Sequence, residues 1–219
     1  MTFHIGRILE NPDVSQMSAE YIYGSRSEQR FIPCTVASGN GEPGGNFGRI
    51  RGGTVLTRYD EDCGHEELVN SCRPYGETTA DGEGTSSNTL IVNDASCYFV
   101  GDYILVDGSE TEIIAIDGLE LTLGSDESWA DGDEVVLAKP DGQGGYVACQ
   151  PCGILYMDVD TWLRRSYSGE NMHTSVPAQL HVVGTVRRER IIGLGPVAEI
   201  ALRLGSGTNI LFFDLADIS

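Results

Sequence analysis

The feature that most constrains the fold is a series of Asp-Gly pairs that separate short apolar or alternating runs between positions 76 and 142. Asp and Gly tolerate the positive φ angles of tight turns, so an Asp-Gly pair between two such runs indicates a β-hairpin. The turns are expected at Asp107-Gly108, at Asp117-Gly118 and around Asp131-Gly132-Asp133, and the strands at 89–93, 103–106, 111–116, 119–122 and 134–138. This part of the chain is therefore predicted to be a compact antiparallel β-meander.

The same stretch is strongly acidic. It carries 16 Asp or Glu residues against one base, Lys139, which is −15 of the formal net charge of −19. Its ends are rich in Gly and Ser, as expected where a module is inserted into a surface loop of another domain. We therefore expect an amino-terminal arm and Gly-rich loop at 1–47, a discontinuous β-rich body at 48–75 and 143–219, and an acidic inserted β-module at 76–142.

The body also favours β-structure, because 28 glycines and 8 prolines indicate many turns between short strands. One helix is expected from 197 to 204, with Pro196 in its first turn and Gly205 as its stop. The predicted fold class is mainly β, a β-rich α+β protein with one short helix. Its strands are expected at 49–58, 146–149, 153–159, 179–186 and 210–213.

Charge and hydropathy restrict the partners. The excess of acids argues against a function that depends on neutralising nucleic-acid phosphates or anionic lipid. No apolar run is long enough to cross a bilayer, and the first residues lack the layout of a signal peptide. We expect a soluble protein made in a cytoplasm, without a direct nucleic-acid or membrane partner.

Six cysteines, at 34, 63, 72, 97, 149 and 152, are too scattered to define a disulfide scaffold, so reduced thiols are expected. Cys149 and Cys152 have the spacing of a redox motif or of half a zinc site. The residues after Cys152 continue as a strand, which disfavours a redox motif. A zinc ion would need further ligands from Cys63, His65 and Cys72, whose spacing is not standard. Small thiols in the core or in loops are the preferred interpretation.

The other chemistry-bearing residues do not form a recognisable site. None of the four histidines lies in a nucleophile elbow, and His181 follows a strand pattern typical of a surface or satisfied interior histidine. Asp131, Asp133 and Glu134 could hold calcium, but the twelve-position calcium loop is absent. We predict no enzyme and no catalytic, cofactor or metal site. A metal- or carbohydrate-dependent hydrolase stays as an alternative, because clustering of carboxylates in space cannot be read from a sequence.

Two arginine pairs stand out in an acidic chain: Arg164-Arg165 and Arg187-Arg188. Thirteen of the fourteen basic residues are arginine, which suits bidentate contacts to carboxylates. The pairs are expected either in internal salt bridges or against an acidic protein surface, provided by another copy of this chain or by a larger partner.

With the module removed, the order of body segments becomes informative. A Gly-Gly-Thr-Val-Leu segment at 52–56 is followed by Gly-Tyr-Val-Ala-Cys at 145–149, Cys-Gly-Ile-Leu-Tyr-Met-Asp-Val-Asp-Thr at 152–161 and Val-Val-Gly-Thr-Val at 182–186. A helix and a closing strand come next. This order resembles that of the lambda-type head decoration proteins of tailed bacteriophages. The resemblance covers 49–59 and 145–213, about a third of the chain, and has no counterpart for the acidic module or the long amino-terminal region.

The resemblance implies a small β-barrel-like body that forms trimers on the outside of a phage head. Its partner would be the major capsid protein, its location the outer surface of the virion, and its role to stabilise the head lattice without chemistry. A phage tail or fibre component is the alternative. We assign Arg164, Arg165, Arg187 and Arg188 to the subunit interface. The apolar residues assigned to capsid binding by the arm are Phe3, Ile5, Ile8, Leu9, Tyr21 and Tyr23.

Overall fold

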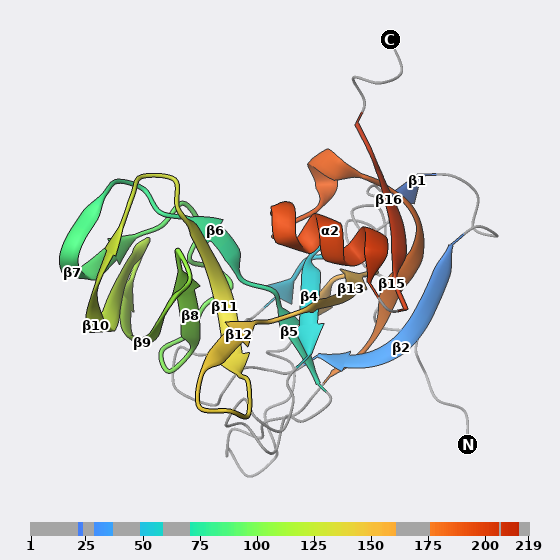
Figure 1. The fold of residues 1–219 in the computed structure, drawn as a ribbon. Coiled ribbons are helices and arrows are strands. Elements are labelled where there is room, and N and C mark those ends of the chain that lie inside the picture. Colours follow the sequence, from blue (N-terminus) through green and yellow to red (C-terminus); the bar gives the residue numbers. More distant parts are fainter. Residues whose placement is uncertain are drawn as a thin grey trace.

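The computed structural model describes residues 22–23, 29–36, 49–58, 71–160, 176–205 and 207–214. In this part of the chain there are two seven-stranded sheets, one two-stranded pair and one α-helix, α2 (Pro196–Leu204). The prediction of a mainly β, barrel-like fold with one short helix is confirmed. Figure 1 shows the two sheets beside each other, with α2 on the side of the first sheet.

The first sheet closes into a small barrel because its longest strand, β15 (Val176–Arg187), has hydrogen-bonded neighbours on both sides. Around the barrel, β15 is followed by β13, β4, β5 and β2, and β2 pairs with β15 again. The contact between β2 and β5 is parallel, with Val36 opposite Cys72. The bounds of these strands are β13 (Pro151–Leu155), β4 (Val55–Arg58), β5 (Cys72–Pro74) and β2 (Arg30–Val36).

The second half of β15 extends beyond the barrel. There it pairs in parallel with β16 (Asn209–Phe213) and in antiparallel with β1 (Ile22–Tyr23). Helix α2 lies between β15 and β16 in the chain, so it provides the crossover that a parallel pair of strands requires. The two-stranded pair consists of β3 (Arg49–Ile50) and β14 (Val159–Asp160).

The second sheet is antiparallel and follows the predicted turns. Asp107 and Gly108 both have positive φ angles, 46° and 80°, and they join β8 to β9 as a tight hairpin. The next hairpin differs in detail, because Asp117 is the last paired residue of β9, and of the two loop residues Gly118 and Leu119 only Gly118 has a positive φ angle, 63°. In chain order the strands are β6 (Glu77–Thr79), β7 (Gly84–Ile91), β8 (Tyr103–Val106), β9 (Ser109–Asp117), β10 (Glu120–Trp129), β11 (Glu134–Pro140) and β12 (Tyr146–Ala148).

Two hydrophobic clusters stabilise these sheets. One fills the barrel and includes Leu56, Leu155 and Leu180, all fully buried. The other is continuous from the barrel to the second sheet, because it contains Ile154 of β13 as well as Leu121 of β10. The alternation of side chains along β13 explains this arrangement, since Leu155 faces the barrel interior while Ile154 faces the shared cluster. The two sheets therefore share one core.

Two boundaries differ from the sequence-based division. Residues 30–36, which we expected in the arm and loop at 1–47, form β2 and close the barrel. This assignment was wrong for β2 because its role depends on β15, which lies far away in the sequence. Residues 146–148, expected in the body, form β12 and pair with β11 of the second sheet. No helix in the described residues is long and apolar enough to span a membrane.

Candidate functional site

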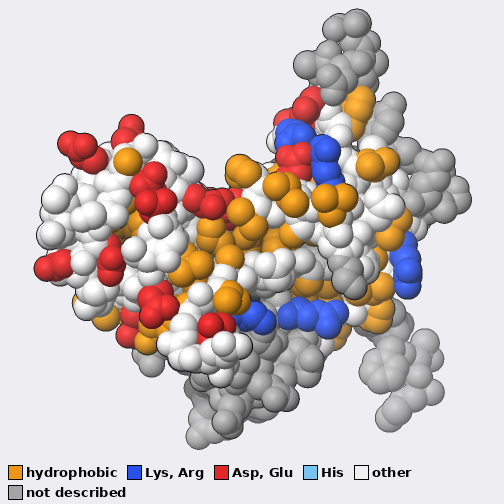
Figure 2. All heavy atoms as spheres, in the orientation of Figure 1, with side chains coloured by type: hydrophobic (Ala, Val, Ile, Leu, Met, Phe, Trp, Pro, Cys, Tyr) orange, Lys and Arg blue, Asp and Glu red, His pale blue; other side chains and the backbone are white. Residues whose placement is uncertain are grey.

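The most prominent surface feature is an apolar face on α2 and β16. Ala198 and Leu202 of α2 are buried, whereas Ile200 and Leu204 are 61% and 83% exposed. On the neighbouring strand β16, Leu211 is 59% exposed. Ile210 packs with α2 in the shared core, so the next side chain, Leu211, points to the other side of the strand. We use the name α2–β16 face for the outer side of α2, which carries Ile200 and Leu204, together with the adjoining edge of β16; Figure 2 shows hydrophobic side chains gathered over these elements. Exposed apolar side chains that lie together commonly mark a protein contact.

The edge of β16 belongs to the same surface. Among the described residues, β16 pairs with β15 alone, so its other edge has no strand partner. An unpaired strand edge presents backbone donors and acceptors to any strand that approaches it. The α2–β16 face therefore combines apolar side chains with an open strand edge.

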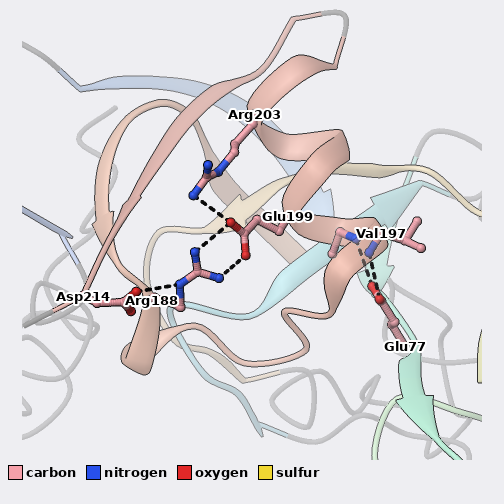
Figure 3. Close-up of polar contacts among 7 residues, drawn as sticks. Glu77, Arg188, Val197, Glu199, Arg203 and Asp214 are labelled. Atoms are coloured by element: carbon pink, nitrogen blue, oxygen red, sulfur yellow. Dashed lines mark hydrogen bonds and ion pairs between the residues drawn. The ribbon is translucent and has the colours of Figure 1, made fainter. Parts of the chain in front are cut away.

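A network of ion pairs lies next to this face (Figure 3). Arg188, which follows β15, pairs with Glu199 of α2 and donates from Nε to Asp214 at 3.2 Å. Arg203 of α2 contacts the same Glu199 at 2.7 Å. The hydrogen bonds that Arg188 donates to Glu199 raise the pKa of Arg188, so the guanidinium stays charged. The network fixes α2 to the end of β15, and its two arginines are balanced by the two carboxylates of Glu199 and Asp214.

The predicted interface arginines are only partly described. Arg188 contacts carboxylates of its own chain, which is the internal alternative left open by the sequence. Arg187 ends β15 opposite Phe213. Arg164 and Arg165 lie outside the described residues, as do five of the residues assigned to capsid binding, Phe3, Ile5, Ile8, Leu9 and Tyr21. For Tyr23 the structure describes the backbone, which pairs with Thr185 of β15. The roles assigned to these residues stay predictions.

A carboxylate from the second sheet holds the first turn of α2 (Figure 3). Glu77 of β6 accepts hydrogen bonds from the backbone N–H groups of Val197 at 3.0 Å and Ala198 at 2.9 Å. These donors have no partner inside the helix, so the carboxylate caps it from another element. Gly195 makes room for this contact, because a Cβ at residue 195 would clash with the Glu77 carboxylate. Burial raises the pKa of Glu77, and nearby Glu134 adds to this effect against the two backbone hydrogen bonds.

A buried ion pair forms the second link between the sheets. Arg73 of β5 donates from Nη1 and Nη2 to the two carboxylate oxygens of Asp102, at 2.6 and 2.7 Å. The two side chains are only 4% and 6% exposed. Arg73 also donates to the backbone oxygen of Cys97 at 2.7 Å. Because a buried charge is stable only with its partner, this pair fixes the second sheet against the barrel.

The two cysteines of the Cys-x-x-Cys motif are separated. Cys149 lies in the core shared by the sheets, whereas Cys152 lies near Cys34 and Cys72 of the barrel. None of the five described cysteines forms a disulfide. In the described residues no group of three or more His, Cys, Asp or Glu side chains is arranged as a metal site. The other residues considered for zinc, Cys63 and His65, lie outside the described part.

The remaining candidates have structural roles. His181 is fully buried, its Nε2 lies 2.9 Å from the backbone oxygen of Val183, and burial lowers its pKa to about 4. It is therefore a neutral interior histidine near pH 7. Asp131 and Asp133, weighed as calcium ligands, accept hydrogen bonds from the backbone N–H groups of Gly82 and Ala130, at 2.8 and 2.6 Å. They stabilise turns of the second sheet.

The sequence did not indicate the capping role of Glu77, the Arg73–Asp102 ion pair or the cluster of the three thiols of Cys34, Cys72 and Cys152. Their partners come from distant parts of the chain, so no local spacing indicates them. Gly195 gives a weak signal for the Glu77 contact, because it stands just before the predicted helix and its lack of a side chain lets another group approach the helix start. Comparisons with protein-family models, with curated proteins and with solved structures found no match to this chain.

Proposed function

We propose that this protein is a structural component of a phage virion that binds the outside of the head as an oligomer and stabilises its lattice. One observation carries the proposal. The segments after residue 150 that resemble the decoration proteins, and the segment at 52–56, all contribute to the barrel, α2 and β16. The acidic strands, which have no counterpart in that family, form the second sheet together with β12, whose residues belong to the resembling segment at 145–149. Three of the four resembling segments, with the helix and the closing strand, therefore lie on the barrel side.

The oligomer contact that we assign is the α2–β16 face, with a second copy of this chain as its occupant. The distribution of charge suits this choice, because acidic side chains are scattered over the second sheet (Figure 2), whereas beside the face the charges of Arg188 and Arg203 are balanced by those of Glu199 and Asp214. Two copies that approach through this face keep their acidic sheets apart. Cyclic association through one such contact would give a closed ring, and the family resemblance suggests three subunits.

Many modest contacts act together in this function. Each subunit would contribute its own contact to the head, and ring closure makes the later contacts intramolecular. Such avidity explains how a small protein can clamp neighbouring capsid subunits without a covalent bond. The apolar residues of the amino-terminal arm, from Phe3 to Tyr23, remain the predicted capsid contact.

The test is binding to expanded, DNA-free heads from the phage that encodes the chain. Purified protein is mixed with heads and separated by sedimentation, and its oligomeric state is measured by light scattering. We expect saturable binding to heads by an oligomer and a higher melting temperature of the heads. A protein that sediments alone at every head concentration, or that binds isolated tails instead, contradicts the proposal.

A further inference from the structure

A cavity of about 550 Å³ opens between the barrel and the carboxyl-terminal end of α2. Ile32, Pro151 and Val182 provide apolar lining, and Arg58 and Lys139 bring two positive charges to it. Cavities of this size commonly hold small molecules. In a chain with a net charge of −19, a cavity with two cations and an apolar wall is suited to an anionic ligand.

One thiol lines this cavity and contacts a second thiol behind it. Cys152 of β13 is among the lining residues, and its Sγ lies 3.9 Å from Sγ of Cys72 on β5. Cys72 is fully buried, whereas Cys152 is partly exposed. Cys34 of β2 contacts Cys72 as well. Three barrel strands therefore place three thiols together, and Cys152 is the one that reaches the cavity.

The three thiols differ in how readily each loses its proton. Hydrogen bonds from Cys152 and then Cys34, together with the positive charge of Arg58, lower the pKa of Cys72 to about 4. The same contacts raise the pKa of Cys152 and of Cys34. The first proton therefore leaves this coupled cluster easily, and the negative charge lies mainly on Cys72, which accepts both thiol hydrogen bonds. A shift of the proton from Cys152 to Cys72 across their contact moves the negative charge to the thiol that reaches the cavity.

A direct disulfide between these two cysteines is disfavoured by the barrel. β5 and β13 lie on opposite sides of β4, so their backbones are separated by two strand spacings, about 9 to 10 Å in a flat sheet. A disulfide needs Cα atoms about 4.4 to 6.8 Å apart. Because both strands are held in the barrel, a reaction partner for Cys152 must come from the cavity.

We propose that Cys152 is a site of S-thiolation, where an anionic low-molecular-weight disulfide such as oxidised glutathione exchanges with the thiol. Cys72 accepts the proton of Cys152 as the Cys152 sulfur attacks one sulfur of the incoming disulfide. The S–S bond of the reagent breaks, a mixed disulfide forms on Cys152, and the leaving thiolate takes up the proton. Arg58 and Lys139 bind the carboxylates of the reagent. Oxidised glutathione is the oxidant and is reduced to one equivalent of glutathione.

The chain contains two internal comparisons for this reactivity. Cys97 also lines a cavity, of about 320 Å³, but burial raises its pKa to about 11. Cys149 is the other cysteine of the Cys-x-x-Cys motif and is 3% exposed in the shared core. Cys97 should react much more slowly than Cys152 because its sulfur contacts the hydroxyl of Ser96 instead of a thiolate that could take up its proton. Cys149 should react more slowly because a buried thiol lacks access to the reagent.

The test treats the native full-length protein with oxidised glutathione and measures the product by intact mass and peptide mapping. The protein carries Cys63→Ser throughout, because Cys63 lies outside the described residues. We expect one glutathionyl group per chain, located at Cys152. Cys152→Ser should abolish the addition, and Cys149→Ser should leave it unchanged. Cys72→Ser should slow the reaction by about tenfold or more, because Cys152 then loses its base. Arg58→Gln should slow the reaction with oxidised glutathione but not with uncharged hydroxyethyl disulfide.

Three results would overturn the proposal. The first is the absence of any addition to the folded protein under conditions that modify it after denaturation. The second is modification of Cys34 or Cys97 at the same rate as Cys152 in the protein without further substitution, a result that requires none of the other variants to fold. The third is a metal ion found by elemental analysis that must be chelated before Cys152 reacts, which would make these thiols ligands. Reaction at Cys152 does not depend on head binding, so each proposal can fail alone.

Discussion

The barrel and the second sheet are both built of short strands, but they form by different kinds of pairing. In the second sheet, β8, β9 and β10 pair with their neighbours in sequence through Asp-Gly turns. In the barrel, β2 pairs with β15, so that Ile32 lies opposite Leu180. Local turn chemistry therefore determines the second sheet. Closure of the barrel depends on pairing between strands that are far apart in the sequence, which no local pattern reveals.

The two regions are also joined more closely than an inserted module would require. They share a core, a buried Arg73–Asp102 pair and the Glu77 cap on α2. We therefore expect them to unfold as one unit, even though their strands pair by different rules.

The largest effect is expected from Arg73→Ala, which leaves Asp102 buried without its partner. Breaking such a pair costs about 3 to 5 kcal/mol of the free energy of unfolding. Urea denaturation measures this change. The control is the double variant Arg73→Leu with Asp102→Leu, which removes both charges and should recover much of the loss. An Arg73→Ala protein as stable as the parent would show that the pair does not join the sheets.

The next largest effect is expected from two matched substitutions that leave a cavity in each region, Leu180→Ala in the barrel and Leu121→Ala in the second sheet. Both leucines are fully buried, so each change should cost about 2 to 5 kcal/mol. Each variant should still unfold in one transition, followed by circular dichroism and by tryptophan fluorescence. If Leu121→Ala produces a second, earlier transition, the second sheet is an independent domain.

A smaller effect is expected at the contact between Glu77 and α2. Glu77→Ala should cost about 0.5 to 2 kcal/mol, as loss of a helix cap does. Because the pKa of Glu77 is raised in the folded state, its contribution is largest at low pH, where the carboxyl group is protonated in both states. It is lost as the pH rises through the raised pKa.

The free energy of unfolding of the parent should therefore fall, relative to Glu77→Gln, as the pH rises from about 4, the ordinary pKa of a glutamate, through the raised pKa of Glu77. Urea midpoints at several pH values measure the difference between the two proteins. A difference that grows with pH would show that the two backbone hydrogen bonds of Glu77 outweigh its burial.

The smallest effect on stability is expected at the α2–β16 face. Leu204→Glu should change the free energy of unfolding by less than about 0.5 kcal/mol, because Leu204 is 83% exposed. The same change should abolish self-association, measured by sedimentation velocity. Leu119→Glu is the matched control, since Leu119 is an exposed leucine of the second sheet. Retained association in Leu204→Glu, with loss in Leu119→Glu, would move the contact to the second sheet.

The sequence predicted those elements whose cause is local. Strand β8 was predicted at its observed bounds, and α2 within one residue, because Asp-Gly turns, Pro196 and Gly205 act on their neighbours. β2 was missed because Arg30–Val36 becomes a strand only against β15. The α2–β16 face was missed for a related reason, since the exposure of Ile200 depends on which side of the helix meets the barrel.

The most direct test is amide hydrogen exchange of the full chain, compared free and bound to heads. In the proposed assembly, the head and subunit contacts lie on the barrel side, and the acidic sheet faces away from the head. Exchange in the arm, β2, α2 and β16 should therefore slow on binding, while exchange in β9 and β10 should stay unchanged. Protection confined to β9 and β10, with none on the barrel side, would contradict this division between the two regions.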